Sequence, residues 1–184
     1  MRILLVLIVL LTSFAANAQQ VATFNLSSPI LEEGGPLPIS AARNGDGCIG
    51  DNITPPLQWS GAPENAKSFT ITMFDPDAKG GGKLHWAVFN IPGDVWSLPS
   101  GAGDEKYELP YPAHALPNSW GKKEYVGACP PEGTKHAYQF TIYAMRDALA
   151  FYPLSAIGKS TVNWLRDNSL GHTTLTVTYE RLPR

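Results

Sequence analysis

The chain has 184 residues, with 14 Lys or Arg against 16 Asp or Glu, so its formal net charge at pH 7 is −2. Its longest basic cluster is the pair Lys122-Lys123, and without a basic stripe neither nucleic acid nor an anionic membrane surface is expected as a partner. The 17 Gly and 16 Pro favour long ordered loops over helices.

The first 18 residues have the pattern of an export signal. Arg2 supplies the positive start, and Ile3–Leu11 is an unbroken apolar run that is shorter than the roughly 20 residues needed to span a bilayer. Ala16-Asn17-Ala18 fits the small-x-small cleavage pattern. We therefore expect a cleaved signal peptide over 1–18, no stable membrane anchor, and a periplasmic or secreted mature protein over 19–184. An uncleaved signal anchor is the alternative.

Strand-like segments dominate the rest of the chain. Most of them alternate between apolar and polar residues, as strands with one buried face do. The segment Trp86–Ile91 is almost continuously apolar, which indicates a strand covered on both faces. The predicted strands are Ala22–Leu26, Phe69–Phe74, Trp86–Ile91, His136–Met145 and Thr173–Tyr179.

One helix is predicted, over about Ser160–Leu170. Ser160 has the side chain of an N-cap, and Gly171 is suited to end the helix in the left-handed conformation. Ser155–Gly158 is expected to add a short turn. The length of the mature chain suffices for one domain with a substantial core. The prediction is a mostly β single domain with one or two peripheral helices.

Cys48 and Cys129 are the two cysteines of the chain. In an exported protein they favour a disulfide, which would close a loop of about 80 residues and tie two Gly- and Pro-rich loops together. Two free thiols are the alternative. Neither a Cys-x-x-Cys spacing nor a Cys/His zinc pattern is present.

Three short polar segments stand inside or beside these apolar runs: Asp75-Pro76-Asp77, Leu84-His85-Trp86 and Gly133–Tyr138. Burying such polar groups without partners costs about 1–3 kcal/mol each, so we expect each of them to have a partner or a ligand. If the segments converge, they form a small polar pocket whose two imidazoles can face an anion.

The pocket hypothesis can be stated in chemical terms. A carboxylate that holds one nitrogen of a His ring fixes its tautomer and leaves the other nitrogen facing a cavity. Tyr138 lies on the same side of its strand as His136. Backbone N–H groups near Gly127-Ala128-Cys129 would complete a concavity that prefers phosphate, sulfate or carboxylate.

Simpler interpretations stand beside this one. Asp75 or Asp77 can cap a turn, His85 can be a satisfied core residue, and His136 can be an exposed strand end. A metal site built from these four residues matches no known ligand spacing. No G-x-S-x-G elbow is present, which disfavours nucleophilic catalysis, whereas acid–base hydrolysis by either His stays open.

In this order, the polar segments resemble the phosphatidylethanolamine-binding protein family, also called the Raf kinase inhibitor protein family, and in particular its exported bacterial members. The likeness runs from about Phe24 to Leu182. The matching segments are Asn52–Leu57 with Trp59, Asp75–Ala78, His85–Pro92, Tyr125–Pro131 and Gly133-x-x-His136-x-Tyr138.

The resemblance implies a β-sandwich of a large and a small antiparallel sheet with peripheral helices, and a pocket for phosphate-like anions and phosphorylated head groups. The implied ligand-binding residues are Asp75, His85, Gly127, Pro131, His136 and Tyr138, with Asp77, Lys79 and Tyr179 as possible rim positions. Lys79 replaces a Pro of the family motif, and Ala137 replaces an Arg, so loop shape and partner contacts are expected to differ.

We therefore expect a non-enzymatic exported protein that binds a small anionic or phosphorylated ligand without cofactor or metal. The first alternative is an interaction protein that inhibits a protease or a kinase through surface loops such as Lys79–Lys83. A protease or a host protein is the better target for an exported chain. The second alternative is a weak hydrolase that uses a pocket His.

Overall fold

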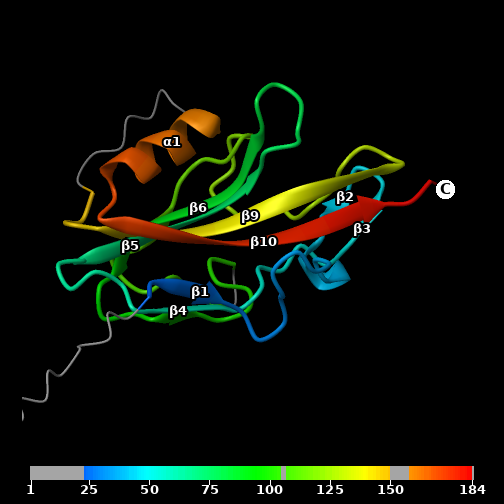
Figure 1. Cartoon of the computed structure of the whole chain (residues 1–184). Helices are drawn as coiled ribbons and strands as arrows, with labels where there is room; N and C mark the ends of the chain where they lie inside the picture. Colours follow the sequence, from blue (N-terminus) through cyan, green and yellow to red (C-terminus); the bar gives the residue numbers. More distant parts are fainter. Residues whose placement is uncertain (1–22, 105–106, 150–157, 184) are drawn as a thin grey trace, which may run out of the picture.

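The computed structural model describes residues 23–104, 107–149 and 158–183 (Figure 1). Within these ranges the protein consists mainly of antiparallel strands with one α-helix. The strands are β1 Asn25–Ser27, β2 Asn44–Gly45, β3 Cys48–Ile49, β4 Leu57–Ser60, β5 Ser68–Asp75, β6 Lys83–Pro92, β7 Ser97–Leu98, β8 His114–Ala115, β9 Thr134–Met145 and β10 Gly171–Arg181. The helices are the 3-10 turn η1 Ile39–Ala41 and α1 Lys159–Asn168.

A large sheet with the strand order β10-β9-β5-β6-β8 forms the centre of the molecule. A small sheet, β1-β4-β7, packs on one face of it, and α1 packs on the opposite face (Figure 1). The hairpin β2-β3 lies beside the end of the large sheet where β10 finishes. The predicted mostly β fold is confirmed.

The central strand β5 shows why these layers form, because all eight of its residues are buried. Phe69, Ile71 and Met73 point into the core between the two sheets. Phe74 points to the other face, where it packs in the smaller core that also contains Leu165 of α1. Burial on both faces agrees with the nearly continuous apolar character of β6, whereas β5 buries Thr70 and Thr72 among its apolar residues.

Four of the predicted strands are confirmed as β5, β6, β9 and β10. The strand predicted over Ala22–Leu26 begins later in the structure than the sequence indicated. Ala22 lies outside the described residues, and β1 begins at Asn25 because only Asn25–Ser27 pair with β4. The predicted turn at 155–158 also falls almost wholly outside the described residues.

The predicted helix exists, but both of its predicted caps were wrong. Gly158, with φ of 89°, occupies the N-cap position, and Ser160 is already inside the first turn. The helix ends at Asn168, and Gly171 pairs with Ala144 as the first residue of β10. Gly171 therefore belongs to the sheet, although the local sequence pattern assigned it to the end of the helix.

No helix among the described residues is long and apolar enough to cross a membrane.

Candidate functional site

A cavity of about 530 Å³ opens at one end of the large sheet. In an antiparallel sheet, the ends of β5 and β10 lie beside the starts of β6 and β9, so four neighbouring strands contribute to this end. The lining residues are Arg43, Asp46, Asp75, Asp77, Ala78, Lys79, Lys83, His85, Trp120, Cys129, Pro130, Pro131, Thr134, His136 and Arg181.

Asp75, the last residue of β5, organises this end of the sheet. Its side chain is buried, and its Oδ1 accepts hydrogen bonds from the backbone N–H groups of Asp77 at 2.8 Å and Ala78 at 3.0 Å. Its Oδ2 accepts a hydrogen bond of 2.8 Å from Nδ1 of His136. The carboxylate therefore caps the turn after β5 and also orients an imidazole.

Asp77 connects the loop after β5 to β9 by a hydrogen bond. Its Oδ2 accepts a hydrogen bond of 2.7 Å from the backbone N–H of Ala137. Because His136 precedes Ala137, the loop after β5 and the start of β9 are held together by two carboxylates rather than by one. The orientation of the His136 ring is thereby fixed by both its side chain and its backbone.

His85 lies on β6 and is 4% exposed. Its Nδ1 is 2.7 Å from the carbonyl oxygen of Val126, which can only accept, so Nδ1 carries the ring proton. The ring packs edge-on against Trp120 at 4.9 Å and Tyr138 at 5.3 Å between centroids. Burial lowers the pKa of His85 to about 4, against the partly opposing effects of the Val126 carbonyl and of Asp75.

Tyr138 lies behind His85 rather than in the cavity wall. It is fully buried, and its hydroxyl has no hydrogen-bond partner in the described structure. Burial, assisted by the negative charge of Asp75, raises the pKa of Tyr138, so the phenol stays neutral. Its role at this site is to support the His85 ring.

Four cationic side chains surround the cavity: Arg43, Lys79, Lys83 and Arg181. Arg43 and Lys83 both lie over the Trp120 ring, with the guanidinium carbon at 5.4 Å and Nζ at 4.9 Å from its centroid. These are cation–π distances. Two cationic side chains therefore lie over Trp120, whose ring packs against His85.

The loop that carries Trp120 is held by a buried amide, Asn118, which is 0% exposed. Its Oδ1 accepts hydrogen bonds from the backbone N–H groups of Trp120 at 2.9 Å and Lys122 at 3.1 Å. Its Nδ2 donates to the carbonyl oxygens of Glu124 at 3.0 Å and His85 at 3.4 Å. One side chain therefore links the loop to β6.

We expect Asn118→Ala to lower the free energy of unfolding by about 1–3 kcal/mol, because it leaves several buried backbone groups without partners. Urea unfolding followed by circular dichroism would measure the change. The exposed Asn65→Ala serves as control and should stay within about 0.5 kcal/mol of the parent. Equal losses in the two variants would contradict the role given to Asn118.

The disulfide between Cys48 and Cys129 is formed, as the sequence predicted. It joins β3 to the segment that leads into Pro130 and Pro131, and Cys129 itself lines the cavity. The hairpin β2-β3 is thereby attached to the cavity wall, which brings Arg43 and Asp46 to the rim, where they form an ion pair of 2.7 Å.

The structure places six of the nine sequence-predicted residues in the cavity lining: Asp75, Asp77, Lys79, His85, Pro131 and His136. Gly127, Tyr138 and Tyr179 lie outside it. The N–H of Gly127 donates to Oδ1 of Asn52 at 2.8 Å and is not free for an anion. Tyr179 pairs with His136 across β9 and β10, and its side chain packs against the core between the sheets.

Sequence reasoning missed Arg43, Trp120 and Arg181, and it noted Lys83 only as part of a loop. A Cβ on Gly47 would meet the Arg181 guanidinium, which shows how closely β10 approaches the β2-β3 turn. No local pattern marks these residues, because each comes from a different loop or strand end. The only available signal was the aromatic Trp120 in a polar, Gly-containing stretch.

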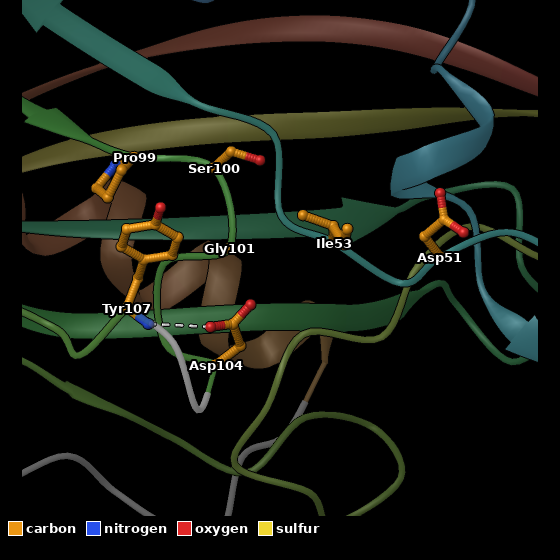
Figure 2. Close-up of a pocket in the computed structure, with 7 residues that line it drawn as sticks. All are labelled: Asp51, Ile53, Pro99, Ser100, Gly101, Asp104 and Tyr107. Atoms are coloured by element: carbon orange, nitrogen blue, oxygen red, sulfur yellow. Dashed lines mark hydrogen bonds between the residues drawn. The ribbon is translucent and has the colours of Figure 1, made fainter.

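A second cavity, of about 630 Å³, is lined by Asp51, Ile53, Pro99, Ser100, Gly101, Asp104 and Tyr107 (Figure 2). Oδ1 of Asp104 accepts a hydrogen bond of 3.1 Å from the backbone N–H of Tyr107. None of the described residues that line this cavity is Lys, Arg or His. The described lining of this second cavity therefore has no cationic side chain that could bind an anion. The cavity at the end of the large sheet is the candidate site.

Comparison with known proteins places this architecture in a family. The model of the family described as phosphatidylethanolamine-binding protein matches residues 27–180. The chain therefore belongs to the phosphatidylethanolamine-binding protein family. The UPF0098 protein YbcL of Escherichia coli K12 is 38% identical over 171 residues, which are 91% of this chain and 93% of YbcL. YbhB of the same strain is 42% identical over 121 residues, 65% of this chain and 77% of YbhB.

Solved structures agree with this membership. The crystal structure of E. coli YbcL, described as a new member of the mammalian PEBP family, matches with a TM-score of 0.76 at 38% identity. The match covers 85% of this chain and 98% of that one. The structure of CT736 from Chlamydia trachomatis matches with a TM-score of 0.69 at 30% identity, covering 87% and 99%. The family resemblance and the fold expected from the sequence are both confirmed.

Proposed function

We propose that this protein is an exported, non-enzymatic binding protein whose cavity holds phosphate-like anions or phosphorylated head groups. The observation that carries the proposal is the convergence of two imidazoles and four cationic side chains on one cavity. Phosphate recognition uses such groups, with Arg and Lys supplying charge and His taking part in a directed hydrogen bond. The family description supports the same ligand class.

The three carboxylates in the cavity lining do not cancel this preference. Asp75 is occupied by two backbone N–H groups and His136, Asp77 by the Ala137 N–H, and Asp46 by Arg43. A carboxylate whose oxygens already accept hydrogen bonds presents less negative charge to a ligand. Lys79 and Lys83, by contrast, form no ion pair within the described residues and stay available to an anion.

Among the described residues that line the cavity, no side chain is arranged as an activated nucleophile. Cys129 is bonded to Cys48, and Oγ1 of Thr134 donates to the Pro131 carbonyl at 2.7 Å. The raised pKa of Tyr138 keeps that phenol protonated. These features support binding rather than covalent catalysis.

The proposal of export rests on the signal-like sequence of residues 1–18, which lie outside the described residues. The Cys48–Cys129 disulfide supports it, because disulfides persist in oxidising compartments such as the periplasm. Mass spectrometry of the protein purified from its native cell envelope would test it, with Gln19 expected as the first residue. A chain that retains Met1 would contradict cleavage.

Calorimetric titration with phosphorylethanolamine and with inorganic phosphate should show binding by the parent protein. We expect His85→Ala and His136→Ala each to weaken it about tenfold to a hundredfold, because each removes a hydrogen bond to a charged group. His114→Ala is the matched control, since His114 is exposed on β8 and does not line the cavity. No heat in the parent, or undiminished binding in both pocket variants, would contradict the proposed function.

A further inference from the structure

The two imidazoles of the cavity have different hydrogen-bond partners, and His85 has the more sharply defined role. His85 uses Nδ1–H to bind the Val126 carbonyl, so in the neutral ring Nε2 bears a lone pair and no proton. Nε2 has no hydrogen-bond partner within the described residues, although the ring lines the cavity. His85 therefore offers the ligand a hydrogen-bond acceptor.

The surroundings of His85 keep it in this form. The ring is almost fully buried between Trp120 and Tyr138, and Lys83 adds a nearby positive charge. Both effects lower its pKa and outweigh the opposite effects of Asp75 and of the Val126 and Gly127 carbonyls. A second proton on Nε2 is disfavoured until the solution is strongly acidic.

His136 has a different hydrogen-bond partner. Its Nδ1 donates to Oδ2 of the Asp75 carboxylate at 2.8 Å, whereas His85 donates to a backbone carbonyl. The two rings line the same cavity, and the acceptor at Nε2 is assigned to His85 because its ring is buried against a carbonyl.

Resting on the proposed function, we propose that the cavity selects anions that carry a proton. These are hydrogen phosphate and phosphate monoesters as monoanions, in preference to sulfate esters and phosphodiesters. The ligand P–OH donates to Nε2 of His85, while its ionised oxygens face the cationic side chains of the cavity. An ionised oxygen placed against the Nε2 lone pair gains no hydrogen bond and meets a second acceptor. A site built to pair with a ligand O–H rejects analogues that lack it.

The test compares O-phosphorylethanolamine with ethanolamine O-sulfate by calorimetry at pH 5.5. The two ligands have the same shape, and at this pH the phosphate ester is mostly a monoanion, so the main difference is one proton. We expect the phosphate ester to bind at least tenfold more tightly. A third ligand, glycerophosphoethanolamine, is a phosphodiester like a lipid head group; weaker binding than phosphorylethanolamine favours a free monoester as the natural ligand class.

Variants assign the preference to His85. In His85→Gln the side-chain amide can rotate to donate or accept, so the preference for phosphate over sulfate should fall to about twofold or less. His136→Gln should weaken both ligands and keep the preference. Equal affinities for the two esters in the parent overturn this inference and leave the proposed function intact, whereas binding of neither ester overturns both. The parent ratio decides the question even if His85→Gln fails to fold.

Discussion

Replacing Cys48 and Cys129 together by Ala is expected to lower the free energy of unfolding by about 2–5 kcal/mol. The two residues are 81 positions apart in the chain, so the bridge restricts a long loop in the unfolded ensemble. The effect is expected to be large because β2 and β3, which the bridge attaches, are only two residues long. Guanidinium unfolding at pH 7, without reductant, would measure it.

The matched control for the disulfide is chemical reduction. Dithiothreitol should lower the stability of the parent to about that of the double Ala variant, and it should leave the variant itself unchanged. A double variant whose unfolding midpoint equals that of the oxidised parent would contradict a stabilising role. Because Cys129 lines the cavity, anion titration of the double variant below its unfolding midpoint would also report how far the bridge shapes the site.

The long strands could be read from the sequence because their side chains follow the period of a sheet. In β9, Tyr138, Phe140 and Ile142 alternate with residues of the opposite face, and this alternation is what packing between two layers requires. The short strands β2, β3, β7 and β8 could not be read. Two residues carry no periodicity, and they pair only because the long strands bring them together.

The helix caps illustrate the limit of local signals. Ser160 is a good N-cap residue in isolation, yet the helix begins one residue before it. Gly158, which has a positive φ, occupies the N-cap position instead. Gly171 was a credible helix terminator, yet its pairing with Ala144 extends the sheet. In both cases tertiary structure overrides a weak local preference.

The residues of the candidate site were likewise only partly predictable from the sequence. Asp75, His85 and His136 could be singled out because ionisable residues are rare in or beside buried strands. The cations could not, because Arg43 and Arg181 resemble ordinary solvated charges until the fold brings their loops and strand ends together. The preference of the site for an anion therefore depends on residues that are distant in sequence and unremarkable in type.

Acidification from pH 7 to pH 4 should cost the protein about 2–4 kcal/mol of folding stability through His85 alone. Burial lowers the pKa of His85 from 6.5 to about 4 in the folded protein, so the unfolded chain takes up the proton first as the pH falls. Well above pH 6.5 both states are neutral and His85 contributes no pH dependence. Between pH 6.5 and 4 the loss grows by roughly 1.4 kcal/mol per pH unit.

Urea unfolding at pH 7, 5.5 and 4 would measure this loss, and His85→Gln separates it from the effects of other titrating groups. Gln cannot take up a proton, so the variant should be less stable than the parent at pH 7 but should lose about 2–4 kcal/mol less on acidification. His114→Gln, at an exposed imidazole, should lose as much as the parent. If His85→Gln and the parent lose stability in parallel, His85 is not held neutral in the folded state. The fixed acceptor that the cavity is inferred to offer a protonated anion would then be lost as well, because that acceptor requires a neutral ring.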